Sequence, residues 1–265
     1  MRRRLEMTAD TPPQISPQRA LTRVSMAPVV WCALLLSVSA SAQAEPRQQL
    51  SATSPGILLS VGRLTVPGRR MQGGHQRHYR ESCSATLLAP AAGGPASLIL
   101  TAWHCLEYHS DLTDSITFII QSTSGEQLRR RAQPISSGGG MHADWSLLRL
   151  HKPLPADKVR SAELARGAAP GEGSRITMAG YSRDDGLGQA GHVLTFHRDC
   201  TVTAITDDDL ATDCLAYRGA SGGAVFSTDS GTLVGVISRG DSRENSIFVP
   251  TSRILERIGK RLLRH

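Results

Sequence analysis

A chain of 265 residues, of which 40% are hydrophobic, is long enough to bury one large core or two smaller ones. Its 30 lysines and arginines exceed its 23 acidic residues, which gives a formal net charge of +7. Five of the arginines fall within residues 1–44, and no stripe of aromatic residues accompanies the others. Composition therefore excludes a disordered chain and a multi-span membrane protein, and it does not indicate nucleic-acid binding.

The N-terminus resembles a secretory leader. Arginines precede a short apolar run at residues 27–39, and the small-residue sequence Ala42-Gln43-Ala44 follows it. This pattern is typical of a signal peptide, here cleaved after Ala44, with either Met1 or Met26 as its start. The run is shorter than the roughly 18–20 apolar residues of a membrane anchor. We therefore expect a secreted or periplasmic protein with no stable membrane insertion after cleavage.

Four cysteines remain after this cleavage: Cys83, Cys105, Cys200 and Cys214. An even number of cysteines in an exported chain indicates disulfides, and four cysteines allow three pairings. Cys83–Cys105 and Cys200–Cys214 are the pairs nearest in sequence. A zinc site is the alternative, but no C-x-x-C or H-x-x-x-H spacing accompanies the cysteines. We expect no metal and no cofactor.

The part of the chain after the leader reads as many short strands and one helix. Residues 45–56 are polar and predict a loose arm, and from residue 57 short apolar runs alternate with turn residues. Apolar residues at helical spacing predict a helix over 251–265. The predicted strands lie in the runs 57–65, 82–89, 97–105, 115–121, 145–150, 175–181, 192–203, 222–227, 232–238 and 246–250.

This pattern favours an all-β fold of antiparallel barrels or sandwiches. Residues 152–174 have the composition of a linker and divide the chain into two similar halves, 57–151 and 175–250. We therefore predict one domain over 45–265 that contains two β-structured halves.

Three segments carry residues suited to chemistry. A buried strand at 98–103 delivers His104, Asp144 stands at the head of an apolar strand, and Ser221 lies in a glycine-rich turn. Nucleophilic acyl transfer needs a hydroxyl, a neutral imidazole that takes its proton, and a buried carboxylate that orients the imidazole. The N–H groups of Gly219 and Ser221 supply a candidate oxyanion hole.

The motifs T-A-x-H-C at 101–105, D-x-S-L-L at 144–148 and G-x-S-G-G at 219–223 resemble those of the trypsin-like (chymotrypsin-fold) serine peptidases, in the same order. The resemblance implies two six-stranded antiparallel barrels with a C-terminal helix and a site between the barrels. It implies His104 as general base, Asp144 as its orienting partner and Ser221 as nucleophile. It also implies a Cys83–Cys105 bridge.

The same resemblance implies a set of substrate-binding residues. Residues 236–240 resemble the strand that pairs with the substrate backbone, and Leu215, six residues before the serine, falls at the base of the primary pocket. A leucine there disfavours lysine or arginine, and Ile237 stands where acid-specific relatives carry histidine, so an apolar or small side chain is expected. The substrate-binding residues predicted are Leu215, Arg218, Ser238, Arg239 and Gly240.

Ala220 departs from the pattern of animal digestive enzymes, which carry an aspartate before the serine to receive a newly cut N-terminal amine. We therefore expect no such activation switch. Residues 61–64 (Val-Gly-Arg-Leu) resemble the first strand of the bacterial glutamyl-endopeptidase-like branch.

Two alternatives fit part of this pattern. The sequence G-x-S-x-G at 219–223 also fits the nucleophile elbow of α/β-hydrolases, but that fold needs a histidine after the serine, and only His265 follows. A catalytically silent binding protein with a peptidase fold is the second alternative, and the complete triad argues against it. We predict a monomeric, exported serine endopeptidase that acts on protein or peptide substrates and binds no nucleic acid.

Overall fold

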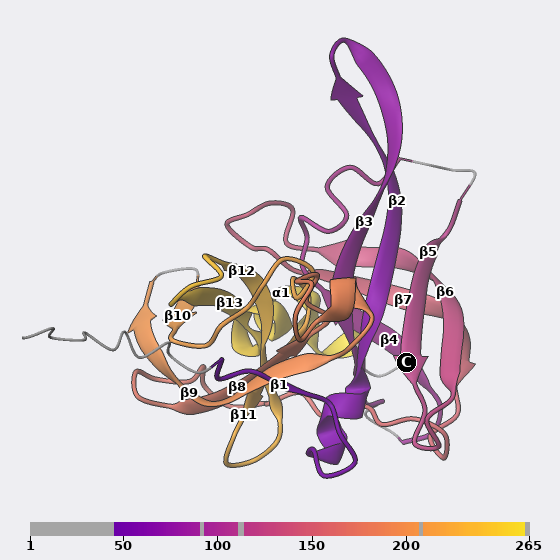
Figure 1. Cartoon of the computed structure of the whole chain (residues 1–265). Coiled ribbons are helices and arrows are strands. Elements are labelled where there is room, and N and C mark those ends of the chain that lie inside the picture. The colour runs from indigo at the N-terminus through magenta and orange to yellow at the C-terminus, as the bar shows by residue number, and fades with distance from the viewer. Residues whose placement is uncertain (1–44, 91–92, 111–113, 207–208, 263–265) are drawn as a thin grey trace, which may run out of the picture. The chain divides into compact units, whose positions relative to one another are not determined.

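A computed structural model describes residues 45–90, 93–110, 114–206 and 209–262, and the predicted leader at 1–44 lies outside this range. The described elements, in chain order (Figure 1), are β1 (Gln48–Gln49), the 3-10 helix η1 (Gly56–Ser60), β2 (Val61–Gln72), β3 (His75–Leu88), β4 (Ala96–Thr101), β5 (Ile116–Gln121), β6 (Gln127–Ser137), β7 (Ser146–Leu154), β8 (Arg175–Gly180), η2 (Gln189–Gly191), β9 (Thr195–Ile205), β10 (Leu210–Thr212), β11 (Ala224–Ser227), β12 (Leu233–Gly240), β13 (Ser246–Pro250) and α1 (Thr251–Leu262).

The first half of the described chain forms a closed antiparallel barrel in the order β2-β3-β4-β7-β6-β5. Side chains alternate across each strand, so one face of the sheet fills the interior. Leu64, Ile99, Phe118 and Leu148 are fully buried there.

The second half forms another antiparallel barrel. Its strands follow the order β9-β10-β13-β12-β11-β8, and a β8–β9 pairing closes the ring. The short strand β1 adds to β9, with Gln48 opposite Phe196. Ile176, Val225 and Phe248 fill the interior. The predicted fold, two six-stranded antiparallel barrels followed by a helix, is confirmed.

The two barrels share an apolar core where they meet. Leu100 and Trp145 of the first barrel lie in one buried cluster with Phe196 and Val236 of the second, and Ile254 of α1 joins it. This shared core fixes one barrel against the other, which a site formed by both barrels requires.

Residues between β7 and β8 run along both barrels. Ala162 bridges to Leu88 of the first barrel, and Leu164 bridges to Leu233 of the second. The segment predicted as a linker is therefore held near its middle by backbone pairing with both barrels.

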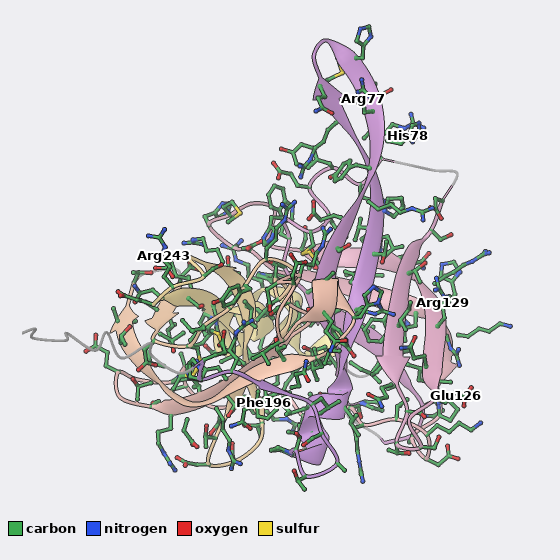
Figure 2. All side chains as sticks on the ribbon, viewed as in Figure 1. Arg77, His78, Glu126, Arg129, Phe196 and Arg243 are labelled. Atoms are coloured by element: carbon green, nitrogen blue, oxygen red, sulfur yellow. A yellow bond between two sulfur atoms is a disulfide. The ribbon has the colours of Figure 1, made fainter. Side chains whose placement is uncertain are left out.

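The β2–β3 hairpin is longer than the apolar runs predict. Pairing continues to Gln72 opposite His75, and the two-residue turn Gly73-Gly74 has the positive φ values of 59° and 78° that favour glycine. Figure 1 shows this hairpin projecting beyond the barrel, and Figure 2 shows Arg77 and His78 near its tip. The outer half of the hairpin is polar and exposed, so no apolar pattern in the sequence predicts that the strands extend this far.

Strand β6 was also missed, for a similar reason. Only Ala132 of its residues is buried, and three consecutive arginines precede it in the strand. The arm at 45–56 is not loose as expected, because β1 pairs with β9 and Arg47 is buried. Among the described residues, the helices are all too short or too polar to cross a bilayer.

Candidate active site

His104 lies just beyond β4, whose residues are almost all buried in the first barrel. The next residue, Cys105, forms a disulfide with Cys83 of β3. The Thr101 hydroxyl, at the end of β4, donates to the Ser84 carbonyl at 2.7 Å. The histidine therefore sits on a short turn that is anchored on both sides.

Asp144 is fully buried immediately before β7. One carboxylate oxygen accepts the His104 backbone N–H at 2.9 Å, and the other lies 2.8 Å from His104 Nδ1. The Ser238 hydroxyl donates to this second oxygen at 2.5 Å. A carboxylate can only accept, so Nδ1 carries the proton and Nε2 of a neutral imidazole is left with its lone pair.

Opposing effects act on the Asp144 carboxyl. Burial desolvates it and raises its pKa, but the hydrogen bonds from His104 and Ser238 and the nearby imidazole outweigh burial. The pKa of Asp144 therefore lies below its ordinary value, and the group is ionised at neutral pH.

Ser221 lies in a turn that needs glycine on either side. Gly219 has φ of 96° and Gly222 has φ of 80°, in the left-handed region. A Cβ on Gly219 would lie 2.6 Å from the Tyr181 carbonyl oxygen, and one on Gly222 would collide with Thr101 Oγ1. The glycines are therefore required by conformation and by close packing.

The amide groups of Gly219 and Ser221 are fixed by the carbonyls that precede them. The carbonyl before Gly219 accepts the Arg183 N–H at 2.7 Å, and the carbonyl before Ser221 accepts the Gly223 N–H at 2.9 Å. In a trans peptide the N–H points opposite to the C=O, and no described peptide is cis. Within the part of the chain that the structure describes, neither N–H has an acceptor. Both donors are thus oriented and unused, as an oxyanion hole requires.

His104 and Ser221 line one pocket of about 390 Å³. Four of the five predicted substrate-binding residues line the same pocket: Arg218, Ser238, Arg239 and Gly240. Leu215 does not. It borders a separate cavity of about 10 Å³, together with Arg47.

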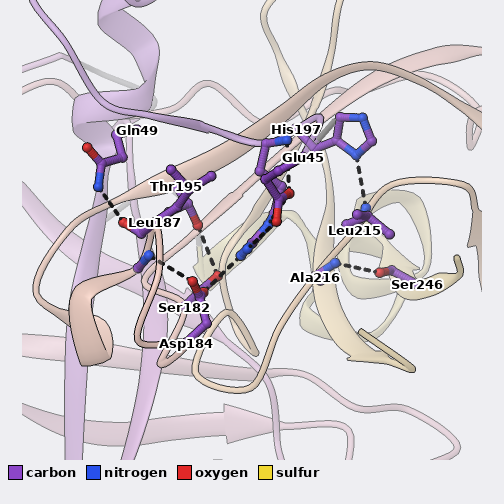
Figure 3. A network of polar contacts seen from close by, with 12 residues as sticks. Glu45, Gln49, Ser182, Asp184, Leu187, Thr195, His197, Leu215, Ala216 and Ser246 are labelled. Carbon is purple, nitrogen blue, oxygen red and sulfur yellow. Dashed lines mark hydrogen bonds and ion pairs between the residues drawn. The ribbon is translucent and has the colours of Figure 1, made fainter. Parts of the chain in front are cut away.

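Backbone contacts hold the segment around Leu215 in place (Figure 3). The Leu215 N–H donates to Nδ1 of His197 at 3.0 Å, and the Ala216 N–H donates to the Ser246 hydroxyl at 2.9 Å. Burial lowers the pKa of His197, which keeps the imidazole neutral and able to accept. This half-buried histidine was not singled out by sequence.

Cys200 and Cys214 form the second disulfide, beside His197. In the part of the chain that the structure describes, two groups of cysteine and histidine have a geometry that could suit a metal. One contains Cys200 and Cys214, and the other contains Cys83 and Cys105, so all four sulfurs are in disulfides. A sulfur in a disulfide cannot act as a thiolate ligand, so neither group is a metal site while the disulfides persist.

Sequence reasoning also missed Ser84. Its hydroxyl donates to the Gly219 carbonyl at 2.9 Å and accepts the Tyr181 N–H at 2.8 Å, which ties the first barrel to the serine turn. A serine inside a strand that is otherwise apolar, next to a cysteine, is the signal that could have found it.

Two closed six-stranded barrels, with His104, Asp144 and Ser221 at their junction, define the class of chymotrypsin-fold serine peptidases. The family model of the trypsin-like peptidase domain matches residues 83–236, which include all three residues and more than half of the chain. The chain belongs to this family. No curated protein matches the sequence. Its resemblance to the glutamyl-endopeptidase-like branch stays a prediction.

Proposed function

We propose that this protein is an exported serine endopeptidase that hydrolyses peptide bonds through an acyl-enzyme on Ser221. One observation carries the proposal. The imidazole of His104, oriented by buried Asp144, shares a pocket with Ser221, and the backbone N–H groups of Ser221 and of Gly219 in the same turn are unused among the described residues. These are the groups that acyl transfer requires.

In the proposed reaction, Nε2 of His104 takes the Ser221 proton as the hydroxyl oxygen attacks the scissile carbonyl. Asp144 stabilises the imidazolium, and the Gly219 and Ser221 N–H groups bind the oxyanion. His104 then protonates the leaving amine, and the acyl group stays on Ser221. A water molecule, deprotonated by His104, attacks the ester; His104 then returns that proton to the Ser221 oxygen as the acid product leaves. Every step uses groups of this chain and water.

Export is the second part of the proposal. Cleavage after Ala44 would leave Glu45 as the first residue of a domain over 45–265, with barrels near 57–151 and 175–250, a connecting segment at 152–174 and a helix from 251. Two disulfides favour an oxidising compartment, secreted or periplasmic. We propose a monomer.

The proposal is tested with purified protein beginning at Glu45, incubated with a diverse peptide library and analysed by mass spectrometry. We expect cleavage that Ser221→Ala and His104→Ala abolish. An apolar or small residue is expected before the cleaved bond, whereas a strong preference for lysine or arginine would contradict that part. Binding of peptides without any cleavage would instead identify a silent, peptidase-fold binding protein.

A further inference from the structure

A second and larger pocket, of about 550 Å³, lies beside the proposed site. It is lined by β2 and β3 of the first barrel, by residues of β5 and β6, and by the loop after β8 of the second barrel. It shares no lining residue with the pocket that holds His104 and Ser221. It is therefore a separate hollow formed by both barrels.

This larger pocket begins next to the serine turn. Arg183, one of its lining residues, donates its N–H to the carbonyl before Gly219, and its Cγ lies 2.8 Å from where a Cβ on Gly219 would be. Cys83, another lining residue, is bonded to Cys105 beside His104. The pocket thus borders both the oxyanion donors and the catalytic histidine.

The position of the pocket relative to Ser221 indicates which part of a bound substrate would reach it. If the acyl portion lies along Ser238–Gly240 in the smaller pocket, the chain after the scissile bond must leave Ser221 on the other side. An extended peptide advances about 3.3 Å per residue. The first three or so residues after the bond would therefore pass along the pocket bordered by Arg183 and Cys83.

The pocket is strongly basic. Four arginines line it, and among the described residues Asp114 is the one carboxylate in its lining. The arginines are Arg63, Arg80, Arg129 and Arg183.

Little of this positive charge is neutralised. Arg80 pairs with Asp114 at 2.6 Å, whereas Arg63 contacts an imidazole nitrogen of His192 at 3.1 Å, which leaves its charge in place. Among the described residues, no carboxylate pairs with Arg129 or Arg183. Guanidinium groups bind carboxylates well, often with two parallel hydrogen bonds.

We propose that this pocket binds acidic side chains of the substrate within about three residues after the scissile bond. The proposal rests on the proposed peptidase function and adds the substrate class: polypeptides in which an aspartate or glutamate follows the cleaved bond. The selectivity comes from charge, because the lining arginines are spaced around an open, water-accessible hollow.

The test uses peptides that share one cleavable acyl-side sequence and carry either aspartate or asparagine at the first, second or third position after the bond. Binding is measured by fluorescence anisotropy on Ser221→Ala, and kcat/KM is measured on the active protein. We expect aspartate to be preferred by about tenfold at one or more positions, as suits a partly exposed charge pair at low salt. The preference should shrink as the salt concentration rises.

The double variant Arg129→Gln/Arg183→Gln should bring the aspartate-to-asparagine ratio toward one, since it keeps the backbone N–H of residue 183 and removes two of the three charges that no carboxylate neutralises. Arg175→Gln is the matched control, because Arg175 is an exposed arginine of β8 outside this pocket, paired with Asp229. It should keep the full ratio.

Equal binding of the two peptides to Ser221→Ala, or an unchanged ratio in the double variant, would overturn this proposal. An activated ester with a small, uncharged leaving group reports on the peptidase function separately, because nothing of it reaches the basic pocket. Hydrolysis of that ester without any preference for aspartate would contradict only the proposal that the basic pocket binds acidic side chains. A preference in binding without ester hydrolysis would reject the catalytic function alone.

Discussion

The guanidinium of Arg47 lies 3.6 Å from the centre of the Tyr217 ring, beneath the segment that leads to Ser221. The Arg47 side chain is only 3% exposed and pairs with Glu45 at 2.8 Å and with Asp184 at 2.9 Å. A residue of the N-terminal arm thus supports a wall of the substrate pocket, since Tyr217 lines it. Where related digestive enzymes hold this turn with an aspartate, this chain carries Ala220 and places a buried arginine nearby.

Arg47→Ala is expected to lower the free energy of unfolding by about 2–3 kcal/mol, since it removes a buried cation, leaves Asp184 without its partner and exposes the Tyr217 ring. It should also raise KM more than it lowers kcat, because Tyr217 lines the pocket while the triad contacts remain. Urea unfolding and steady-state kinetics measure the two effects. Arg175→Ala, which breaks an exposed pair with Asp229, should cost under about 1 kcal/mol. Equal costs for the two variants would contradict the role given to Arg47.

Gly219→Ala should reduce kcat by at least about 100-fold, because the added Cβ would press on the Tyr181 carbonyl oxygen and shift an oxyanion donor. Gly231→Ala is the matched control. Gly231 also has a positive φ, of 69°, but a Cβ there would meet nothing within 4 Å. In Gly231→Ala only the unfavourable backbone conformation should matter. We expect it to lower the free energy of unfolding by about 1 kcal/mol and to leave kcat unchanged. A similar kcat for both variants would argue against the donor role of Gly219.

Ser238→Ala should lower kcat/KM by about 10- to 100-fold. The variant removes a hydrogen bond to the ionised Asp144 carboxylate, and a hydrogen bond to a charged group contributes roughly 1.5–3 kcal/mol. The loss should appear mainly in kcat, because Asp144 orients His104 and does not touch substrate. Ser230→Ala, in an exposed turn, serves as the control for loss of a hydroxyl. Activity that is unchanged in Ser238→Ala would show that His104 alone holds the carboxylate.

The three residues of the predicted triad could be picked out from the sequence because each lies next to a segment with a clear pattern, either an apolar strand or a run of glycines. The apolar run of β4 marks the strand before His104, the apolar start of β7 marks the strand after Asp144, and glycines mark the turn at Ser221. The two-barrel fold followed from strand-length apolar runs and from the family resemblance.

Other features could not be predicted from the sequence because they depend on contacts with residues that are distant along the chain. Arg47 is polar and sits in a polar stretch, so its burial depends on Tyr217 and Asp184, which are more than a hundred residues away. Strand β6 is rich in arginine and buries only Ala132, so pairing with β5 and β7 forms it, without an apolar pattern. The surroundings of Leu215 could not be predicted either, because its spacing from Ser221 along the chain does not determine which cavity its side chain borders.

Stability should fall as the pH drops below about 6.5, in part through His197. Burial lowers the pKa of this imidazole from its ordinary value of 6.5, and Arg47 adds to the effect, while Asp213 and Glu45 oppose it. The unfolded chain therefore binds the proton more readily, so the stabilisation is complete above 6.5 and is lost as the pH falls through the lower pKa of the folded state.

His197→Gln keeps a hydrogen-bond acceptor for the Leu215 N–H but does not titrate, so it should flatten the pH dependence of unfolding in this window. Asp144 acts in a separate range. Its pKa is lowered from 3.8, so its stabilisation is lost only as the pH falls below about 4. Urea unfolding from pH 4 to 8 measures the difference, and identical pH profiles for the two proteins would contradict the role of His197.

The most direct test of the central claim is fluorophosphonate labelling of the mature protein, read by intact mass and peptide mapping. The account predicts one adduct per chain, on Ser221, formed in the folded protein and abolished by Ser221→Ala or by prior denaturation. His104→Ala should label far more slowly, because no base then takes the hydroxyl proton. Failure of the native protein to label, or labelling that survives Ser221→Ala, would contradict the account.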